Sequence, residues 1–178
     1  MSHIMVDLET MGNGNRAAII AIGAVEFNNY GRTGKEFYEQ VNLESSVFSG
    51  LEMDASTVLW WLQQSDEARS AFIGNQQAGE LHGVLLNFAE WMGQFTQVKL
   101  WGNGAAFDNT ILSAAYRTCG IDQPWKFCND RCYRTMKALH SSITLKRIGT
   151  HHNALDDAKY QADHLVKIIK ESTGLGIL

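Results

Sequence analysis

The chain has 178 residues, of which 45% are hydrophobic and 10% aromatic, so it can bury a substantial core and is expected to form one domain over residues 1–178. The N-terminus carries no basic leader and no apolar run approaches the ~20 residues of a membrane span, so we expect a cytoplasmic protein without a membrane partner. A net charge of −4 argues against a protein that binds nucleic acid along its whole length by releasing counterions.

The opening segment predicts three strands. Residues 3–8 are mostly apolar, and a second apolar run covers residues 17–27 after the turn-rich segment 12–15. A third strand is expected over residues 35–41. Because the turn at residues 28–31 is short, the second and third strands should pair in an antiparallel meander.

Beyond residue 41, the spacing of apolar residues changes from that of strands to that of helices. Strands first, followed by alternating helices and strands, predict an α/β fold with a mixed sheet covered by helices. The expected elements are helices at 56–64, 66–73 and 78–95, a strand at 98–101, a helix at 105–118, a strand at 125–127, and helices at 131–140 and 153–171.

Two acidic residues lie two positions apart on the first predicted strand. Side chains at such spacing project from the same face, so the carboxylates of Asp7 and Glu9 can converge on one ion. Mg²⁺ and Mn²⁺ prefer oxygen ligands of this kind. A strand end whose acids face water has the same pattern, so the pair alone does not define a site.

A third acid, Asp108, shares a helical stripe with the apolar residues Ile111, Leu112 and Ala115. A carboxylate among core positions is costly unless it is neutralised, paired with a cation or bound to a metal. A salt bridge or the capping of a neighbouring loop would meet the same need. Both interpretations of Asp108 therefore stay open at this point.

The segment HHNALDDA at 151–158 opens the last predicted helix. Asn153 is a good N-cap, which leaves His152 just before the first turn. On the helix, Asp157 lies at the edge of the apolar stripe, whereas Asp156 points nearly opposite and should see only water. Asp157 is therefore the acid expected to meet the others. A solvated or packing role is the alternative for His152.

Residues 124–152 contain six Lys and Arg residues and one acid, Asp130, whereas the rest of the chain has a net charge of −9. This asymmetry suits an enzyme that holds a phosphodiester end at one place, although a solvated basic face has the same composition. The candidates for phosphate contact are Arg131, Arg134, Lys146 and Arg147.

Three segments resemble the exonuclease motifs of the DEDDh superfamily of 3′–5′ exonucleases: VDLET at 6–10, GNGAAFDN at 102–109 and HNALDDA at 152–158. They span the chain in the family's order, and a histidine rather than a tyrosine in the third motif places the chain in the histidine branch. The superfamily includes ribonuclease T, oligoribonuclease and the proofreading subunit of the replicative polymerase. The VDLETMG opening and the segment STVLWWLQQSDEAR at 56–69 look most like its small stand-alone bacterial and phage exoribonuclease-like group.

The resemblance implies a ribonuclease H-like fold with a mixed five-stranded sheet, and two Mg²⁺ or Mn²⁺ ions held chiefly by Asp7, Glu9 and Asp157. It gives Asp108 an assisting role at the second ion, through water. His152 would be the general base, since a histidine with a pKa of about 6.5 can deprotonate water at neutral pH. The reaction would shorten single-stranded RNA or DNA, with RNA slightly favoured, from the 3′ end and release nucleoside 5′-monophosphates.

Substrate contacts are expected beside the metal-binding pair. In the superfamily, the residues that correspond to Thr10 and Met11 hold the terminal nucleotide. Trp60 lies off the apolar stripe of the helix at 56–64 and can stack on a base, although a packing or interface role fits the sequence equally. The stripe consists of Val58, Trp61 and Leu62.

Two other functions are compatible with the sequence. A ribonuclease H-like endonuclease would use the same metals, and a circular substrate would separate the two activities because an exonuclease needs an end. A catalytically silent binding module would keep the fold alone, but it has no physical need for four acids and a histidine at one end of a sheet. The choice between RNA and DNA depends on side-chain placement around the 2′-hydroxyl. A homodimer is compatible with the tryptophan-rich surface.

Overall fold

The computed structural model describes residues 2–70, 72–73, 77–104 and 106–173, and a five-stranded sheet forms its centre. The strands are β1 (His3–Thr10), β2 (Ile19–Asn28), β3 (Gly31–Gln40), β4 (Lys99–Gly102) and β5 (Asp130–Cys132). Their order across the sheet is β3-β2-β1-β4-β5. β1, β2 and β3 pair antiparallel, as the predicted meander requires, and β4 and β5 join parallel to β1.

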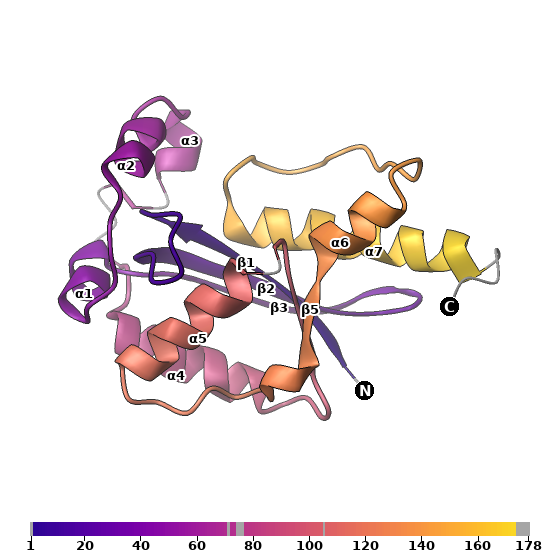
Figure 1. Cartoon of the computed structure of the whole chain (residues 1–178), viewed down its shortest axis with the longest axis horizontal. Helices are drawn as coiled ribbons and strands as arrows, with labels where there is room; N and C mark the ends of the chain where they lie inside the picture. The colour runs from indigo at the N-terminus through magenta and orange to yellow at the C-terminus, as the bar shows by residue number, and fades with distance from the viewer. Residues whose placement is uncertain (1, 71, 74–76, 105, 174–178) are drawn as a thin grey trace.

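Helices cover both faces of this sheet. In Figure 1, α7 lies along one face, and α4 and α5 lie along the other. The helices are α1 (Leu43–Phe48), α2 (Ala55–Trp61), α3 (Asp66–Arg69), α4 (Leu81–Met92), α5 (Asp108–Thr118), the 3₁₀ turn η1 (Phe127–Asn129), α6 (Tyr133–Leu139) and α7 (Ala154–Thr173). The predicted α/β fold with a mixed five-stranded sheet is confirmed. None of the described helices is long and apolar enough to cross a lipid bilayer.

The alternation of side chains along β1 decides which face each residue joins. Ile4, Val6 and Leu8 belong to the larger core, together with residues of α4 and α5. Met5 points to the other face and belongs to the core cluster that contains the buried alanines of α7. Odd-numbered positions of β1 therefore face α7, and the acid at position 7 lies on that side of the sheet.

The last strand lies further along the chain than predicted. The sequence indicated a strand at 125–127, but that interpretation is wrong, and β5 occupies Asp130–Cys132. Trp125 is buried in the larger core, where its ring lies 5.7 Å from that of Tyr116, whereas Phe127 is exposed. Burial of one large aromatic side chain, rather than strand pairing, explains the apolar residues that suggested a strand.

Several helix boundaries also differ from the predictions. The helix expected at 78–95 is shorter, and the one expected at 66–73 ends at Arg69, with residue 71 outside the described part of the chain. The helix expected at 105–118 begins at Asp108, and residue 105 is not among the described residues. The predicted apolar stripe of α2 is wrong at one position, since Leu62 is 58% exposed.

One helix, α1, was not predicted from the apolar pattern. Its N-cap is Asn42, whose side chain accepts a hydrogen bond from Ser45 N at 3.0 Å. This cap is a sequence signal that apolar periodicity does not register, because six residues are too few to show a helical period.

Candidate active site

The two acids of β1 are buried side chains near the C-terminal end of that strand. Asp7 is 8% and Glu9 is 7% exposed, and their strand partners in β2 are Gly23 and Ala21. Both carboxylates project to the face that α7 covers. The prediction that they share one face of a strand is therefore confirmed by the register of the sheet.

A glycine in β2 lets α7 approach these acids. A Cβ atom on Gly23, directly opposite Asp7, would lie 2.2 Å from the carbonyl carbon of Ala154, so any side chain there would push the first turn of α7 away. Gly23 was not among the predicted site residues. A glycine inside an otherwise apolar strand is a known sign of close backbone approach and could have been noticed.

Asp108 is the first residue of α5 and is 1% exposed. Its Oδ1 accepts a hydrogen bond from Leu8 N at 3.1 Å, and its Oδ2 accepts one from Asn103 N at 2.7 Å. Burial raises the pKa of Asp108 to about 6, although these backbone donors and the charge of Arg134 lower it. The carboxylate thus caps a neighbouring loop and also ties α5 to β1 beside the other acids.

His152 lies just before α7, as predicted. Asn153 caps the helix, with its Oδ1 accepting hydrogen bonds from the amides of residues 155 and 156 at 3.1 Å each. The backbone of His152 is left-handed, with φ of 61°, which is uncommon for a residue with a side chain and turns the ring toward α2. Its ring centroid lies 4.8 Å from that of Trp60 and 6.0 Å from that of Trp61.

Burial lowers the pKa of His152, and the charges of His151 and Arg147 lower it further. The imidazole is therefore neutral at neutral pH, which is the form that can accept a proton. The aromatic packing against α2 fixes the ring, and Trp61 itself is held by a hydrogen bond from its Nε1 to Thr10 O at 2.9 Å. The role of Trp61 in supporting the histidine was not foreseen.

The structure brings together two of the predicted metal ligands, Glu9 and Asp157, and the predicted general base, His152. One ligand atom each from Glu9, His152 and Asp157 lies within 4.8 Å of the others. Asp7 is fixed nearby through a hydrogen bond from Gln161 Nε2 to its Oδ1 at 2.6 Å, another contact that the sequence analysis missed. Gln161 lies one helical turn after Asp157, so the i+4 spacing on α7 was the available signal.

The electrostatics of this group favour a cation. Burial, with added repulsion from Asp108, raises the pKa of Glu9 to about 8 and raises the pKa of Asp7 well above its ordinary value. Such shifts mean that ionised carboxylates lack sufficient compensating charge. A hard divalent ion with oxygen ligands supplies that charge, so the residues present fit Mg²⁺ or Mn²⁺.

Asp157 also contacts a cation of the protein itself. Its carboxylate forms an ion pair with Arg147, whose guanidinium carbon lies 5.3 Å from the centroid of the Tyr160 ring. Arg147 is therefore inside the site, beside the acids. The phosphate contact predicted for Arg147 is not tested by this arrangement.

Asp156 does not see only water, so that expectation is wrong. Its Oδ2 accepts a hydrogen bond from Thr150 N at 2.8 Å, and the side chain is partly buried by Gly149. The loop before α7 folds back over this carboxylate. Helix geometry correctly directed Asp156 away from the site, but it could not show that a loop would cover it.

The predicted nucleotide contacts have different surroundings. The Thr10 hydroxyl donates a hydrogen bond to Gly12 O at 2.7 Å, and Met11 is 3% exposed and belongs to the larger core. Trp60 is 41% exposed, so it both packs on His152 and presents surface to solvent. Their contacts with a nucleotide stay predictions.

The remaining basic candidates are spread out. Arg134 lies beside Gly104 and acts on Asp108, so it is at the edge of the site. Arg131 donates hydrogen bonds to the carbonyl oxygens of Cys128 and Asp130, and it lies near His3 at the opposite end of β1 from the acids. Lys146 borders a separate hollow with Arg32 and Lys159.

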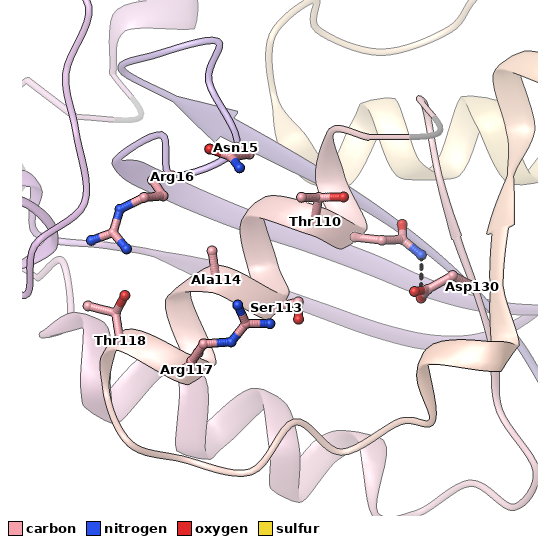
Figure 2. A pocket seen from close by; sticks show the side chains of 9 residues that line it. Asn15, Arg16, Thr110, Ser113, Ala114, Arg117, Thr118 and Asp130 are labelled. Atoms are coloured by element: carbon pink, nitrogen blue, oxygen red, sulfur yellow. Dashed lines mark hydrogen bonds between the residues drawn. The ribbon is translucent and has the colours of Figure 1, made fainter.

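A hollow of about 440 Å³ lies away from the acids, between residues 15–16 and the outer face of α5 (Figure 2). Two arginines line it. Arg16 already donates to Gly50 O and pairs with Glu52, whereas the side chain of Arg117 forms no hydrogen bond or ion pair among the described residues. This hollow contains none of the five predicted catalytic residues and is not the candidate active site.

The fold and this cluster define a ribonuclease H-like protein of the DEDDh exonuclease superfamily. The chain belongs to the family described as the 3′-5′ exoribonuclease Rv2179c-like domain, which matches residues 2–169, and it is a 3′–5′ exonuclease. It is 26% identical to the exodeoxyribonuclease of Enterobacteria phage T4, over 76% of this chain and 70% of that protein. The nuclease domain of 3′hExo, a DEDDh family member bound to rAMP, has the same fold, with a TM-score of 0.66 at 15% identity, covering 96% of this chain and 92% of that one.

Proposed function

We propose that the chain removes nucleotides from the 3′ end of single-stranded nucleic acid, with RNA favoured over DNA, and releases nucleoside 5′-monophosphates. The observation that carries this proposal is the convergence of Glu9, His152 and Asp157 within 4.8 Å beside the buried Asp7. The family description supports RNA, whereas the phage relative is described as acting on DNA. Rates measured on RNA and DNA of the same sequence test this preference.

In the proposed mechanism, Asp7, Glu9 and Asp157 would hold two Mg²⁺ or Mn²⁺ ions, and Asp108 would assist at the second ion. Two such ions, when bound, supply the positive charge that stabilises the attacking and leaving oxygens of an in-line displacement. His152 accepts the proton of the attacking water on a ring nitrogen, and its lowered pKa keeps that nitrogen free at neutral pH.

The remaining side chains position these groups. Trp60 and Trp61 fix the ring of His152, and Gln161 fixes the carboxylate of Asp7. Trp60 offers an exposed ring edge or face for the terminal base, and Arg134 offers a cation beside Asp108 for a phosphate. We also propose that Thr10 and Met11 help to hold the terminal nucleotide, as the corresponding residues do in the superfamily.

The test is incubation of single-stranded RNA and DNA, labelled at the 5′ end, with Mg²⁺, Mn²⁺ or a chelator. We expect stepwise shortening from the 3′ end, release of 5′-monophosphates and no activity with the chelator. A circular single strand is the control for internal cutting. Cleavage of the circle would favour an endonuclease, and intact substrate under every condition would favour a silent binding module.

A further inference from the structure

The segment between α6 and α7 is fastened to α7 by side chains of that helix. Residues 160, 164 and 167 share one face of α7 and bond three consecutive carbonyl groups of the segment. The contacts are Tyr160 OH with Leu145 O at 3.2 Å, His164 Nε2 with Ile143 O at 2.7 Å, and Lys167 Nζ with Thr144 O at 2.7 Å. Figure 1 shows this segment running beside α7 back to its first turn.

The contact of His164 is the most buried of the three. His164 is 2% exposed, and its other ring nitrogen lies 2.7 Å from the hydroxyl of Tyr133. Because Ile143 O can only accept, Nε2 of His164 carries the proton and Nδ1 accepts from Tyr133. The segment thus reaches Leu145 in a fixed path, and Arg147 follows two residues later.

Arg147 turns from this path into the acid cluster. It forms the ion pair with Asp157, and the two side chains are 25% and 13% exposed. The Nε of Arg147 is buried without a hydrogen-bond partner among the described residues. Charge attraction and the Tyr160 ring therefore hold the guanidinium in place, rather than a complete set of hydrogen bonds.

The charge of Arg147 acts on the acids of β1 as well as on Asp157 of α7. Burial raises the pKa values of Asp7 and Glu9, and Arg147 opposes the rise in each case. An arginine stays protonated in proteins, so it cannot leave such a cluster by losing its charge. A divalent ion that binds Asp157 must compete with this guanidinium directly.

We propose that Arg147 is a built-in counter-ion of the candidate metal site, which pairs with Asp157 and must release that carboxylate before a divalent ion can bind it. The inference rests on the proposed metal site. The fastened segment sets the position of Arg147, and the guanidinium lies over the partly buried ring of Tyr160 while it is paired with Asp157. Metal affinity is thereby limited by a residue that lies outside the ligand set.

The experiment is calorimetric titration of the full chain with Mn²⁺, comparing the wild type with Arg147→Gln, which removes the charge but keeps a polar side chain. We expect roughly tenfold tighter Mn²⁺ binding in Arg147→Gln, the order of effect of removing one partly exposed competing charge. The metal-free variant should also melt at a lower temperature than the wild type, because its acids have lost a counter-ion, and saturating Mn²⁺ should remove this difference.

Two further variants make the result specific. Lys146→Gln loses the same charge from the neighbouring residue, which borders a different hollow, and should leave Mn²⁺ affinity within about twofold of the wild type. Arg147→Lys keeps the charge and should bring the affinity back toward that of the wild type. If Arg147→Gln does not fold without metal, Arg147→Lys shows whether the charge at this position is what the fold requires.

The outcomes separate this inference from the function on which it rests. Wild-type protein that binds no Mn²⁺ overturns both the metal site and the role of Arg147. Wild-type protein that binds Mn²⁺ while Arg147→Gln binds it equally or more weakly overturns the role of Arg147 alone. Unchanged Mn²⁺ affinity together with a raised KM for oligonucleotide would instead make Arg147 the phosphate contact that the sequence first suggested.

Discussion

The candidate site consists of two halves that are built differently. Asp7, Glu9 and Asp108 belong to the sheet half, where each carboxylate is less than a tenth exposed and is placed by strand register or backbone hydrogen bonds. His152 and Asp157 belong to the helix half, which is more exposed and is placed by a cap, a left-handed residue and an ion pair.

The sheet half is the more buried of the two, and the helix half lies nearer the surface. The backbone of a central strand cannot shift without breaking the sheet, and two backbone hydrogen bonds hold the carboxylate of Asp108, so the sheet half fixes the position of the negative charge. The helix half is less constrained, because the residues between Arg147 and His152 are exposed and follow the part of the segment that is fastened to α7. Charge repulsion is therefore concentrated in the sheet half, and the competing cation Arg147 comes from the helix half.

The largest expected effect comes from changing the sheet half. Asp7→Asn removes a central carboxylate but keeps its volume, so we expect exonuclease activity to fall below detection and Mn²⁺ affinity to drop. Thermal stability of the metal-free chain should rise or stay equal, because a buried repelling charge has gone. Calorimetric titration and thermal melting measure the two effects. Unchanged Mn²⁺ affinity would contradict the assignment.

The adjacent acids of α7 provide a matched pair for the helix half. Asp157→Asn should abolish activity and weaken Mn²⁺ binding, since Asp157 lies with Glu9 and His152. Asp156→Asn should keep most activity and cost about 0.5–1.5 kcal/mol of stability, because it weakens one hydrogen bond from Thr150. Activity assays and denaturant unfolding test the pair. An inactive Asp156→Asn beside an active Asp157→Asn would reverse their roles.

The histidine of the helix half should have a smaller effect on catalysis than the acids. His152→Ala is expected to lower turnover by about 10²- to 10⁴-fold, the usual size of a lost general base, and to leave much of the metal affinity intact. His151→Ala is the control and should change turnover far less. Single-turnover assays at saturating metal measure both variants. Equal losses would mean that the third motif has been aligned in the wrong register.

The smallest expected effect is on the pH dependence of stability. The folded-state pKa of Glu9 is raised from 4.5 to about 8, and that of Asp108 is raised from 3.8 to about 6. Between pH 3.8 and about 8, the folded chain therefore binds more protons than the unfolded chain. In the presence of a chelator, the melting temperature should therefore fall as pH rises through that window. Saturating Mn²⁺ should reduce the fall. A melting temperature that rises steadily from pH 4.5 to about 8 in chelator would contradict the raised folded-state pKa of Glu9.

The sequence by itself determined the local placement of the candidate catalytic residues, because that information is local. Strand alternation placed Asp7 and Glu9 on one face, and cap chemistry at Asn153 set His152 before the helix. Helix periodicity chose Asp157 over Asp156. Each inference used a repeat or a cap that spans a few residues and depends little on the rest of the molecule.

Tertiary structure decided what surrounds those residues, because these contacts join parts of the chain that are far apart. Gly23 lets α7 rest on the sheet, Gln161 reaches Asp7, and Trp61 bonds Thr10 O beneath His152. The same cause explains the errors: Trp125 looked like part of a strand because it is buried in the core, and Asp156 is covered by its own loop. A single sequence records that a residue is apolar or charged, but the partner that makes use of it is chosen by packing across the whole fold.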